Sequence, residues 1–167
     1  MLYALLKRCV CLFFNTLNWL LGGKLPPFGS AAVVVEENDH YLVVELPGKL
    51  IVFPGGFMNW REVPREAAER EGREETGLIV QTDNLIGHYP MTSQDWDTMS
   101  TISFVFHARV IGGKLQNNIE GHPYWLSEQE LRTRMKGLSL TILDDYLRYR
   151  EQQRLLNAKT QMLVGVS

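Results

Sequence analysis

Cysteine is scarce in this sequence: its 167 residues include two, Cys9 and Cys11, both near the N-terminus. Because there are no further thiols, the pair cannot complete a zinc site. Nothing in the sequence requires an oxidising compartment, so we expect a cytoplasmic protein. Both thiols are then expected to be small buried or interfacial groups, with lipidation or redox chemistry as the alternatives.

Excess charge is also lacking. The formal net charge of −2 provides no whole-molecule attraction to nucleic acid, whose binding depends largely on neutralising phosphates. We therefore expect no nucleic acid polymer as a partner, whereas a small phosphorylated ligand needs only a local positive site such as a metal ion. Hydrophobic residues make up 45% and charged residues 22% of the chain, which is ordinary for a globular protein. The length fits one domain with a short appendage.

The N-terminal segment has no uninterrupted run of the roughly 20 apolar residues that span a bilayer. No A-x-A-like cleavage site precedes Gly22-Gly23, so a signal peptide is also a poor match. Wound at about 100° per residue, the segment instead predicts an amphipathic helix with a broad apolar side. Its narrow polar stripe consists of Ala4, Lys7, Arg8, Cys11, Asn15, Asn18 and Gly22.

Two interpretations of residues 1–22 remain open. In the first, the helix lies at a membrane surface, with Trp19 and Lys7-Arg8 as interface residues, and the protein is peripheral to the membrane with an amphiphilic ligand. In the second, which we favour, the helix packs on its own domain or on a second subunit in a homodimer. Gly22-Gly23 ends the helix, and Pro26-Pro27 makes a stiff connector.

Strands and helices are interleaved along the rest of the chain, which predicts a mixed α/β sandwich. A turn cluster at 37–40 predicts a hairpin, and Pro54-Gly55-Gly56 predicts a loop. The predicted strands are 31–36, 41–45, 50–53, 78–80 with a continuation toward 89, 101–110 and 124–126, and the predicted helices are 64–76, 128–135 and 140–155. The predicted units are an N-terminal helix at 1–23, a connector at 24–29, a main domain at 30–155 and a tail at 156–167.

Three carboxylates share one face of the helix predicted at 64–76. Glu71, Glu74 and Glu75 are related by spacings of three and four residues, and their mutual repulsion costs a few tenths of a kcal/mol in water. A divalent cation would convert this cost into a binding site, because Mg²⁺ prefers hard oxygen ligands. The alternative is a solvated acidic face paired with neighbouring arginines.

The spacing of the surrounding stretch decides between these alternatives, because it resembles the Nudix box, G-x5-E-x7-R-E-U-x-E-E-x-G-U, where U is a bulky aliphatic residue. The eight matching positions are Gly56, Glu62, Arg70, Glu71, Glu74, Glu75, Gly77 and Leu78. The resemblance covers roughly residues 28–155. It implies the Nudix fold, a mixed β-sheet sandwiched between helices, here with an extra N-terminal amphipathic helix.

The resemblance also implies an activity: Mg²⁺-dependent hydrolysis of a diphosphate linkage in a small nucleotide-like substrate, with Mn²⁺ as a second candidate metal. Water activated by the metal attacks phosphorus, and Glu71 is our first choice for the base that takes its proton. Arg70 would orient Glu71 or Glu75, and Glu62 would support the loop. The implied metal ligands are the carboxylates of Glu71, Glu74 and Glu75 and the backbone carbonyl of Gly56.

A further acid often comes from outside the box in this family, and Glu120, just before the strand predicted at 124–126, is the candidate for a metal or base role. An ordinary loop carboxylate is the alternative. Two aromatic residues, Trp60 in the box loop and Trp96 in a polar loop, are candidates for substrate binding, although each could instead anchor its loop. The sequence does not indicate which diphosphate is cleaved.

Two residues depart from the pattern of the family. Gly72 stands at an aliphatic position, which weakens the helix by up to about 1 kcal/mol and removes a core contact. Val63 stands where many relatives have a capping Ser or Thr, so we expect the helix start to depend on Pro64 and Glu66. No metal ligand is lost. The alternative function is a catalytically weak or inactive nucleotide-sensing module. Such modules usually lack some of the box carboxylates, whereas this chain retains them all.

Overall fold

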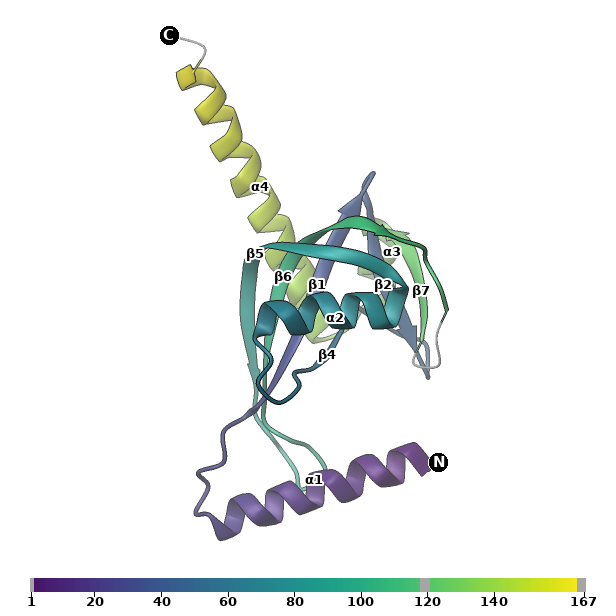
Figure 1. Ribbon diagram of the computed structural model, residues 1–167, viewed down its shortest axis with the longest axis vertical. Coiled ribbons are helices and arrows are strands. Elements are labelled where there is room, and N and C mark those ends of the chain that lie inside the picture. Colours follow the sequence, from purple (N-terminus) through teal and green to yellow (C-terminus); the bar gives the residue numbers. More distant parts are fainter. Residues whose placement is uncertain (1, 118–120, 165–167) are drawn as a thin grey trace.

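A mixed seven-stranded sheet with helices on both faces forms the body of the molecule, and an N-terminal helix lies at one end of it (Figure 1). The computed structural model describes residues 2–117 and 121–164. This arrangement confirms the predicted mixed α/β sandwich with an extra N-terminal helix. In chain order, the elements are α1 (Leu2–Leu20), β1 (Phe28–Glu37), β2 (His40–Leu46), β3 (Leu50–Val52), β4 (Gly55–Phe57), α2 (Pro64–Thr76), β5 (Leu78–Met91), β6 (Thr101–Gly113), β7 (His122–Ser127), α3 (Glu128–Arg134) and α4 (Leu138–Val164).

Strand β1 organises the sheet because it pairs with three other strands. Its first part runs parallel to β6, with Phe28 opposite Thr101, and antiparallel to the short strand β4. Its last two residues pair with β2, which in turn pairs with β3 and β7. The strand order along the main path is β3-β2-β1-β6-β5. The predicted hairpin is confirmed, and both central turn residues, Asn38 and Asp39, have the positive φ that tight hairpin turns require.

Alternating side chains of β1 enter two different cores, because successive residues of a strand point to opposite faces of the sheet. Val33 and Val35 pack with Ala67 and Ala68 of α2. Val34 belongs to the other core, which includes Leu131 of α3, Ile142, Leu143 and Tyr146 of α4, and Met135 between these two helices. Helix α2 therefore covers one face of the sheet, while α3 and α4 cover the opposite one.

The stretch Pro54-Gly55-Gly56 is partly a strand, and the predicted loop is wrong at this point. Gly55–Phe57 forms β4, which pairs with Ser30–Ala32 of β1. The pairing is unusually close: a Cβ atom on Gly55 would lie 2.5 Å from the Ala31 carbonyl oxygen. Glycine is generally depleted in strands. Here its missing side chain allows the two backbones to approach closely, and local strand propensity therefore does not predict β4.

The C-terminal helix is longer than the sequence predicts. Helix α4 continues past Leu155, through the residues expected to form a tail, to Val164. Its second half projects away from the sheet (Figure 1). The side chains from Arg154 to Gln161 are exposed. The helix therefore extends beyond its contacts with the core.

Helix α1 confirms the predicted N-terminal helix and ends at Leu20, shortly before Gly22 and Gly23, whose φ angles are +66° and +76°. The helix packs on its own domain through its polar stripe. Cys11 on that stripe is buried, and the Asn15 side chain donates hydrogen bonds to the loop between β5 and β6. Among the described residues, no helix is both long and apolar enough to cross a bilayer.

Candidate active site

Helix α2 has the predicted bounds, and its two ends are fixed by different means. Val63 at the N-cap provides no side-chain hydrogen bond, Pro64 takes the first helical position, and the Glu66 carboxylate accepts a long 3.5 Å hydrogen bond from the Val63 N–H. At the other end, Gly77 adopts φ +76° and its N–H donates to the Arg73 carbonyl at 2.9 Å. Pro64 and Glu66 therefore occupy the places expected of them at the start of the helix.

Arg70 is the centre of the candidate site. Its Nε and Nη2 donate to the two carboxylate oxygens of Glu62 at 2.7 and 2.9 Å, a bidentate pair. Its Nη1 donates to Glu71 at 2.7 Å and to Glu74 at 3.0 Å. Its Nη2 also reaches the Phe57 carbonyl at 2.9 Å. One guanidinium therefore ties the loop before α2 to the carboxylate face of the helix.

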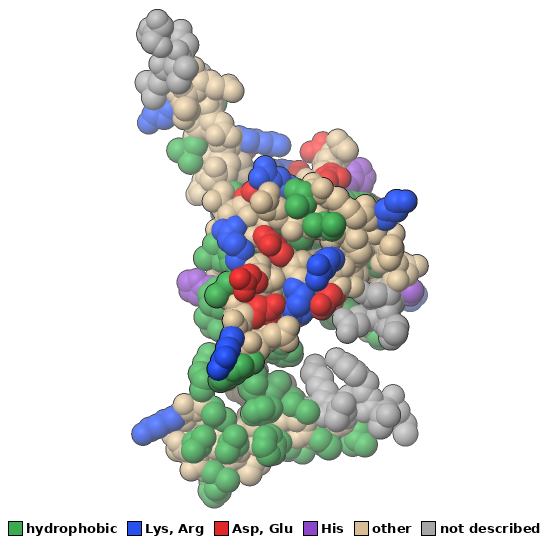
Figure 2. Space-filling model, viewed as in Figure 1, with side chains coloured by type: hydrophobic (Ala, Val, Ile, Leu, Met, Phe, Trp, Pro, Cys, Tyr) green, Lys and Arg blue, Asp and Glu red, His purple; other side chains and the backbone are tan. Residues whose placement is uncertain are grey.

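Burial gives these contacts unequal weight. The side chains of Glu62, Glu71 and Arg70 are 13%, 11% and 18% exposed, whereas that of Glu74 is 52% exposed, so its ion pair is well solvated. The hydrogen bonds from Arg70 lower the pKa of Glu62, and the same bonds raise the pKa of Arg70. Acidic and basic side chains are interspersed over α2 in Figure 2.

Two consecutive glycines bring the backbone of β4 against the helix carboxylates. The Gly55 N–H donates to Glu75 Oε2 at 2.8 Å, and Glu75 is buried. A Cβ atom on Gly56 would lie 2.6 Å from the carboxylate carbon of Glu71. Only glycine leaves room for that carboxylate, so the structure gives a physical reason for the glycine at the start of the box.

Gly72 does not leave an empty space in the core, although the missing side chain predicted the loss of a core contact. A Cβ atom there would lie 2.7 Å from Cγ2 of Val80 and 3.3 Å from Cγ2 of Val33. The two valines occupy the space that an aliphatic side chain at position 72 would take in the resembling family. The predicted loss of a core contact is therefore compensated by close packing of α2 on β1 and β5.

The three helix carboxylates lie on one face, as predicted, but they turn to different partners. Arg70 donates hydrogen bonds to Glu71 and Glu74, whereas Glu75 accepts one from the Gly55 N–H. Within residues 2–117 and 121–164, no three His, Cys, Asp or Glu side chains are grouped closely enough to hold a metal ion. The donors are nonetheless oxygen atoms, beside a glycine cradle at position 56, which suits a hard divalent cation. Glu120, the further acid proposed above, lies outside the described residues.

The two candidate tryptophans lie in different places. Trp60 stands in the loop between β4 and α2 and is 89% exposed, so it does not staple that loop to the domain. Trp96 lies beside α1, where its carbonyl accepts from Asn15 at 2.8 Å. It lines a cavity of about 510 Å³ together with residues of α1 and its own loop, and no α2 residue lines that cavity. The structure does not bring Trp96 to the carboxylate face.

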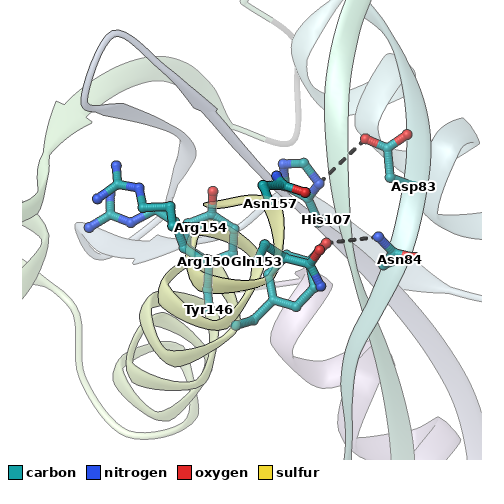
Figure 3. Close-up of a pocket in the computed structure, with 9 residues that line it drawn as sticks. Asp83, Asn84, His107, Tyr146, Arg150, Gln153, Arg154 and Asn157 are labelled. Atoms are coloured by element: carbon teal, nitrogen blue, oxygen red, sulfur yellow. Dashed lines mark hydrogen bonds and ion pairs between the residues drawn. The ribbon is translucent and has the colours of Figure 1, made fainter. Parts of the chain in front are cut away.

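A second polar pocket, of about 520 Å³, lies on the opposite face of the sheet, beside α4 (Figure 3). His107 stacks on Tyr146 with 5.8 Å between ring centroids. Its Nδ1 lies 3.4 Å from an Asp83 oxygen without hydrogen-bond geometry, and it is buried with no hydrogen-bond partner in the part of the chain that the structure describes. Burial lowers the pKa of His107, and the charge of Asp83 partly opposes this effect. The Asn84 side chain donates to the Tyr149 hydroxyl at 2.9 Å, so this pocket joins α4 to the sheet.

Sequence reasoning named the Gly56 carbonyl but missed three other backbone groups of the site. The N–H of Gly55, the carbonyl of Phe57 and the N–H of Asn59 bind Glu75, Arg70 and Glu62, respectively. The only sequence signal for them is the second glycine beside Gly56, which marks a close approach of the backbone.

Comparisons with known proteins agree with this geometry. The family described as the NUDIX domain matches residues 26–146. A Streptomyces ambofaciens protein named MutT-like protein is 32% identical over 125 residues, covering 71% of this chain and 78% of that protein. A Methanocaldococcus jannaschii protein named ADP-ribose pyrophosphatase is 35% identical over 97 residues, covering 55% of this chain. The match spans 56% of that archaeal protein.

A solved structure supports the same grouping. A NUDIX hydrolase from Nitrosomonas europaea superimposes with a TM-score of 0.67 at 25% identity, covering 74% of this chain and 90% of that one. Helix α1 precedes the region that the family covers.

Proposed function

This chain belongs to the NUDIX domain family, and from that premise we propose that it hydrolyses the diphosphate linkage of a nucleoside diphosphate derivative. The observation that carries the proposal is the placement of the Glu71 and Glu75 carboxylates against the glycine backbone of β4, with Arg70 fixing Glu71. A face of carboxylates beside a glycine backbone that carries no side chains is a suitable place for a cation and a diphosphate.

NUDIX hydrolases generally use divalent metal cations. We assign Glu71, Glu74, Glu75 and the Gly56 carbonyl to hold Mg²⁺ or Mn²⁺. When bound, such an ion neutralises charge on the diphosphate oxygens and acidifies water. Arg70 keeps Glu71 oriented by a 2.7 Å hydrogen bond, and Glu71 takes the proton from the attacking water.

ADP-ribose is the substrate that we propose to test first, because the archaeal relative bears that name. Its two phosphates would lie along the carboxylate face, and hydrolysis would yield AMP and ribose 5-phosphate. Trp60, which is 89% exposed in the loop that Arg70 binds through Glu62, is the aromatic residue that we assign to stack on the base. A stacked base contributes about 1–3 kcal/mol in other proteins.

The test is turnover of a panel containing ADP-ribose, other nucleotide sugars, NADH, nucleoside triphosphates and dinucleoside polyphosphates. Products are separated by chromatography with Mg²⁺, with Mn²⁺ and with excess chelator. The Glu71→Gln variant is expected to lose a factor of about 10²–10⁴ in kcat, and chelator should abolish turnover. Glu151→Gln, an exposed change on α4, is the matched control and should retain wild-type activity.

Two outcomes would redirect the assignment. Cleavage of another substrate class, equally sensitive to Glu71→Gln, would keep the hydrolase and replace ADP-ribose. Tight nucleotide binding without turnover of any substrate in the panel would favour the sensing module and overturn the hydrolase.

A further inference from the structure

Helix α1 exposes a large apolar surface. We call the side chains of Leu5, Leu12, Phe13, Trp19, Leu20 and Leu21, which are 39–70% exposed, the apolar face of α1. At 100° per residue they cover an arc of roughly 200° around the helix. Green side chains cover this helix in Figure 2. Exposed apolar patches of this kind mark interaction sites on soluble domains.

Helix α1 is oriented opposite to an ordinary surface helix, whose apolar side faces the domain and whose polar side faces water. Its polar stripe faces the domain: Arg8 pairs with Asp97 at 3.1 Å, and Asn15 donates to the carbonyls of Trp96 and Thr98. The domain thus binds the side of α1 that water would otherwise solvate. A polar group on the outer side, the Thr16 hydroxyl, is satisfied within the helix by the Leu12 carbonyl at 2.7 Å.

Charge distinguishes the N-terminal segment of the chain from the rest, although Arg8 is already paired with Asp97 of the loop between β5 and β6. Residues 1–35 contain Lys7, Arg8 and Lys24 and no Asp or Glu, which gives a formal charge of +3. The whole chain carries −2, so residues 36–167 carry −5. An apolar helix face in a basic segment of an acidic protein is complementary to a surface that combines hydrocarbon with negative charge.

The geometry points to docking of this protein on an anionic lipid surface, with α1 lying in the plane of the interface and its apolar face inserted. An interfacial helix buries its apolar side in the boundary between headgroups and acyl chains. The arc of exposed residues is wider than the seam that one partner helix covers. Pairing with α1 of a second copy would also bring two basic segments together without an acidic residue in either.

Docking would also place the candidate active site near the lipid. The ring of Phe14 in α1 lies 4.7 Å from that of Phe28 at the start of β1, and Phe28 lies 6.4 Å from Phe57 at the end of β4. Phe57 is the residue whose carbonyl binds Arg70. A line of aromatic contacts therefore connects α1 to the loop that begins the carboxylate site.

The test uses the full chain and flotation with vesicles of phosphatidylcholine alone or mixed with phosphatidylglycerol. Leu5→Gln, Leu20→Gln removes two exposed leucines from the apolar face. Leu155→Gln, Leu156→Gln is the matched control, because these α4 leucines are similarly exposed, at 63% and 56%. Circular dichroism and thermal unfolding check that each variant is folded.

We expect the wild-type protein and the α4 control to float with the anionic vesicles, and the α1 variant to lose at least about tenfold in bound fraction. Added salt should weaken binding. Failure of the wild-type protein to bind the mixed vesicles would overturn the proposal, and equal binding to phosphatidylcholine alone would overturn its anionic part. A lipid-free dimer that the α1 variant abolishes would identify a second copy as the occupant instead. None of these outcomes depends on hydrolysis.

Discussion

The carboxylate of Glu71 fills the space in which a side chain at Gly56 would begin. A Cβ atom at position 56 would lie 2.6 Å from both Cδ and Oε1 of Glu71, which is far inside van der Waals contact. The proposed base and the first glycine of the box are therefore sterically coupled. A change at either residue alters the position of the other.

Replacing Gly56 with alanine is expected to displace the Glu71 carboxylate and lower kcat/KM by roughly a hundredfold, because misplacement by about 1 Å costs that much. Steady-state hydrolysis kinetics and a thermal unfolding scan measure the two effects separately. Gly112→Ala is the matched control, since its Cβ would meet only Ile79 Cδ1 at an ordinary 3.7 Å. A Gly56→Ala enzyme with wild-type kcat/KM would contradict the proposed role of Glu71.

Replacing Arg70 with lysine keeps the charge but removes the fork that binds Glu62 and Phe57. We expect a loss of about 2–3 kcal/mol in the free energy of unfolding, because charged hydrogen bonds at partly buried groups are lost. Urea denaturation at pH 7 measures it. Arg73→Lys, at an exposed position of the same helix, should change stability by less than about 0.5 kcal/mol. Similar decreases in the free energy of unfolding for both variants would show that the Arg70 contacts do not stabilise the fold more than those of an exposed arginine.

Replacing Gly72 with alanine tests whether Val80 fills the missing side chain. Helix propensity favours alanine by about 1 kcal/mol, but the 2.7 Å approach to Val80 Cγ2 should make the change destabilising by about 1–2 kcal/mol. In a Val80→Ala background the contact is gone, so the same substitution should become neutral or stabilising. A Gly72→Ala change that stabilises the wild-type protein would mean that the packing is looser than described.

The stability of the fold should depend on the protonation of His107. Burial lowers the pKa of this histidine in the folded state, so the unfolded chain binds the proton more readily. Stability then falls as the pH drops below the unfolded value of about 6.5 and stops falling below the folded pKa. Urea denaturation between pH 5 and 7.5 should show a shallower slope for His107→Gln than for wild type. His88→Gln, an exposed control, should keep the wild-type slope, and an unchanged slope in His107→Gln would refute this assignment.

Sequence alone predicted the features that local chemistry dictates. Proline and glycine at the two ends fixed α2 to the residue, and the i, i+3, i+4 spacing placed its carboxylates on one face. Short-range turn preferences likewise predicted the hairpin between β1 and β2.

The remaining features depend on contacts between distant residues. β4 exists because Gly55 approaches Ala31 of another strand, which no local propensity reveals. A helical wheel separated the two sides of α1 but gave no indication that the polar side would bind Asp97 and Thr98. The same is true of Trp96, whose position depends on α1 and on its own loop. These differences arose where tertiary contacts outweighed local preference.

The pairing of β1 with β6 has a consequence for how the protein is made. Phe28 leaves the ribosome long before Thr101, the residue that faces it in the finished sheet, and domains are generally assembled in the order of synthesis. The partners of β1 in β2 and β4 are translated soon after it, so the nascent chain can build the hairpin and the carboxylate helix first. Until Thr101–Ala108 emerges, β1 has an open hydrogen-bonding edge. Both edges of β1 can therefore be hydrogen-bonded to neighbouring strands only after this segment has been translated.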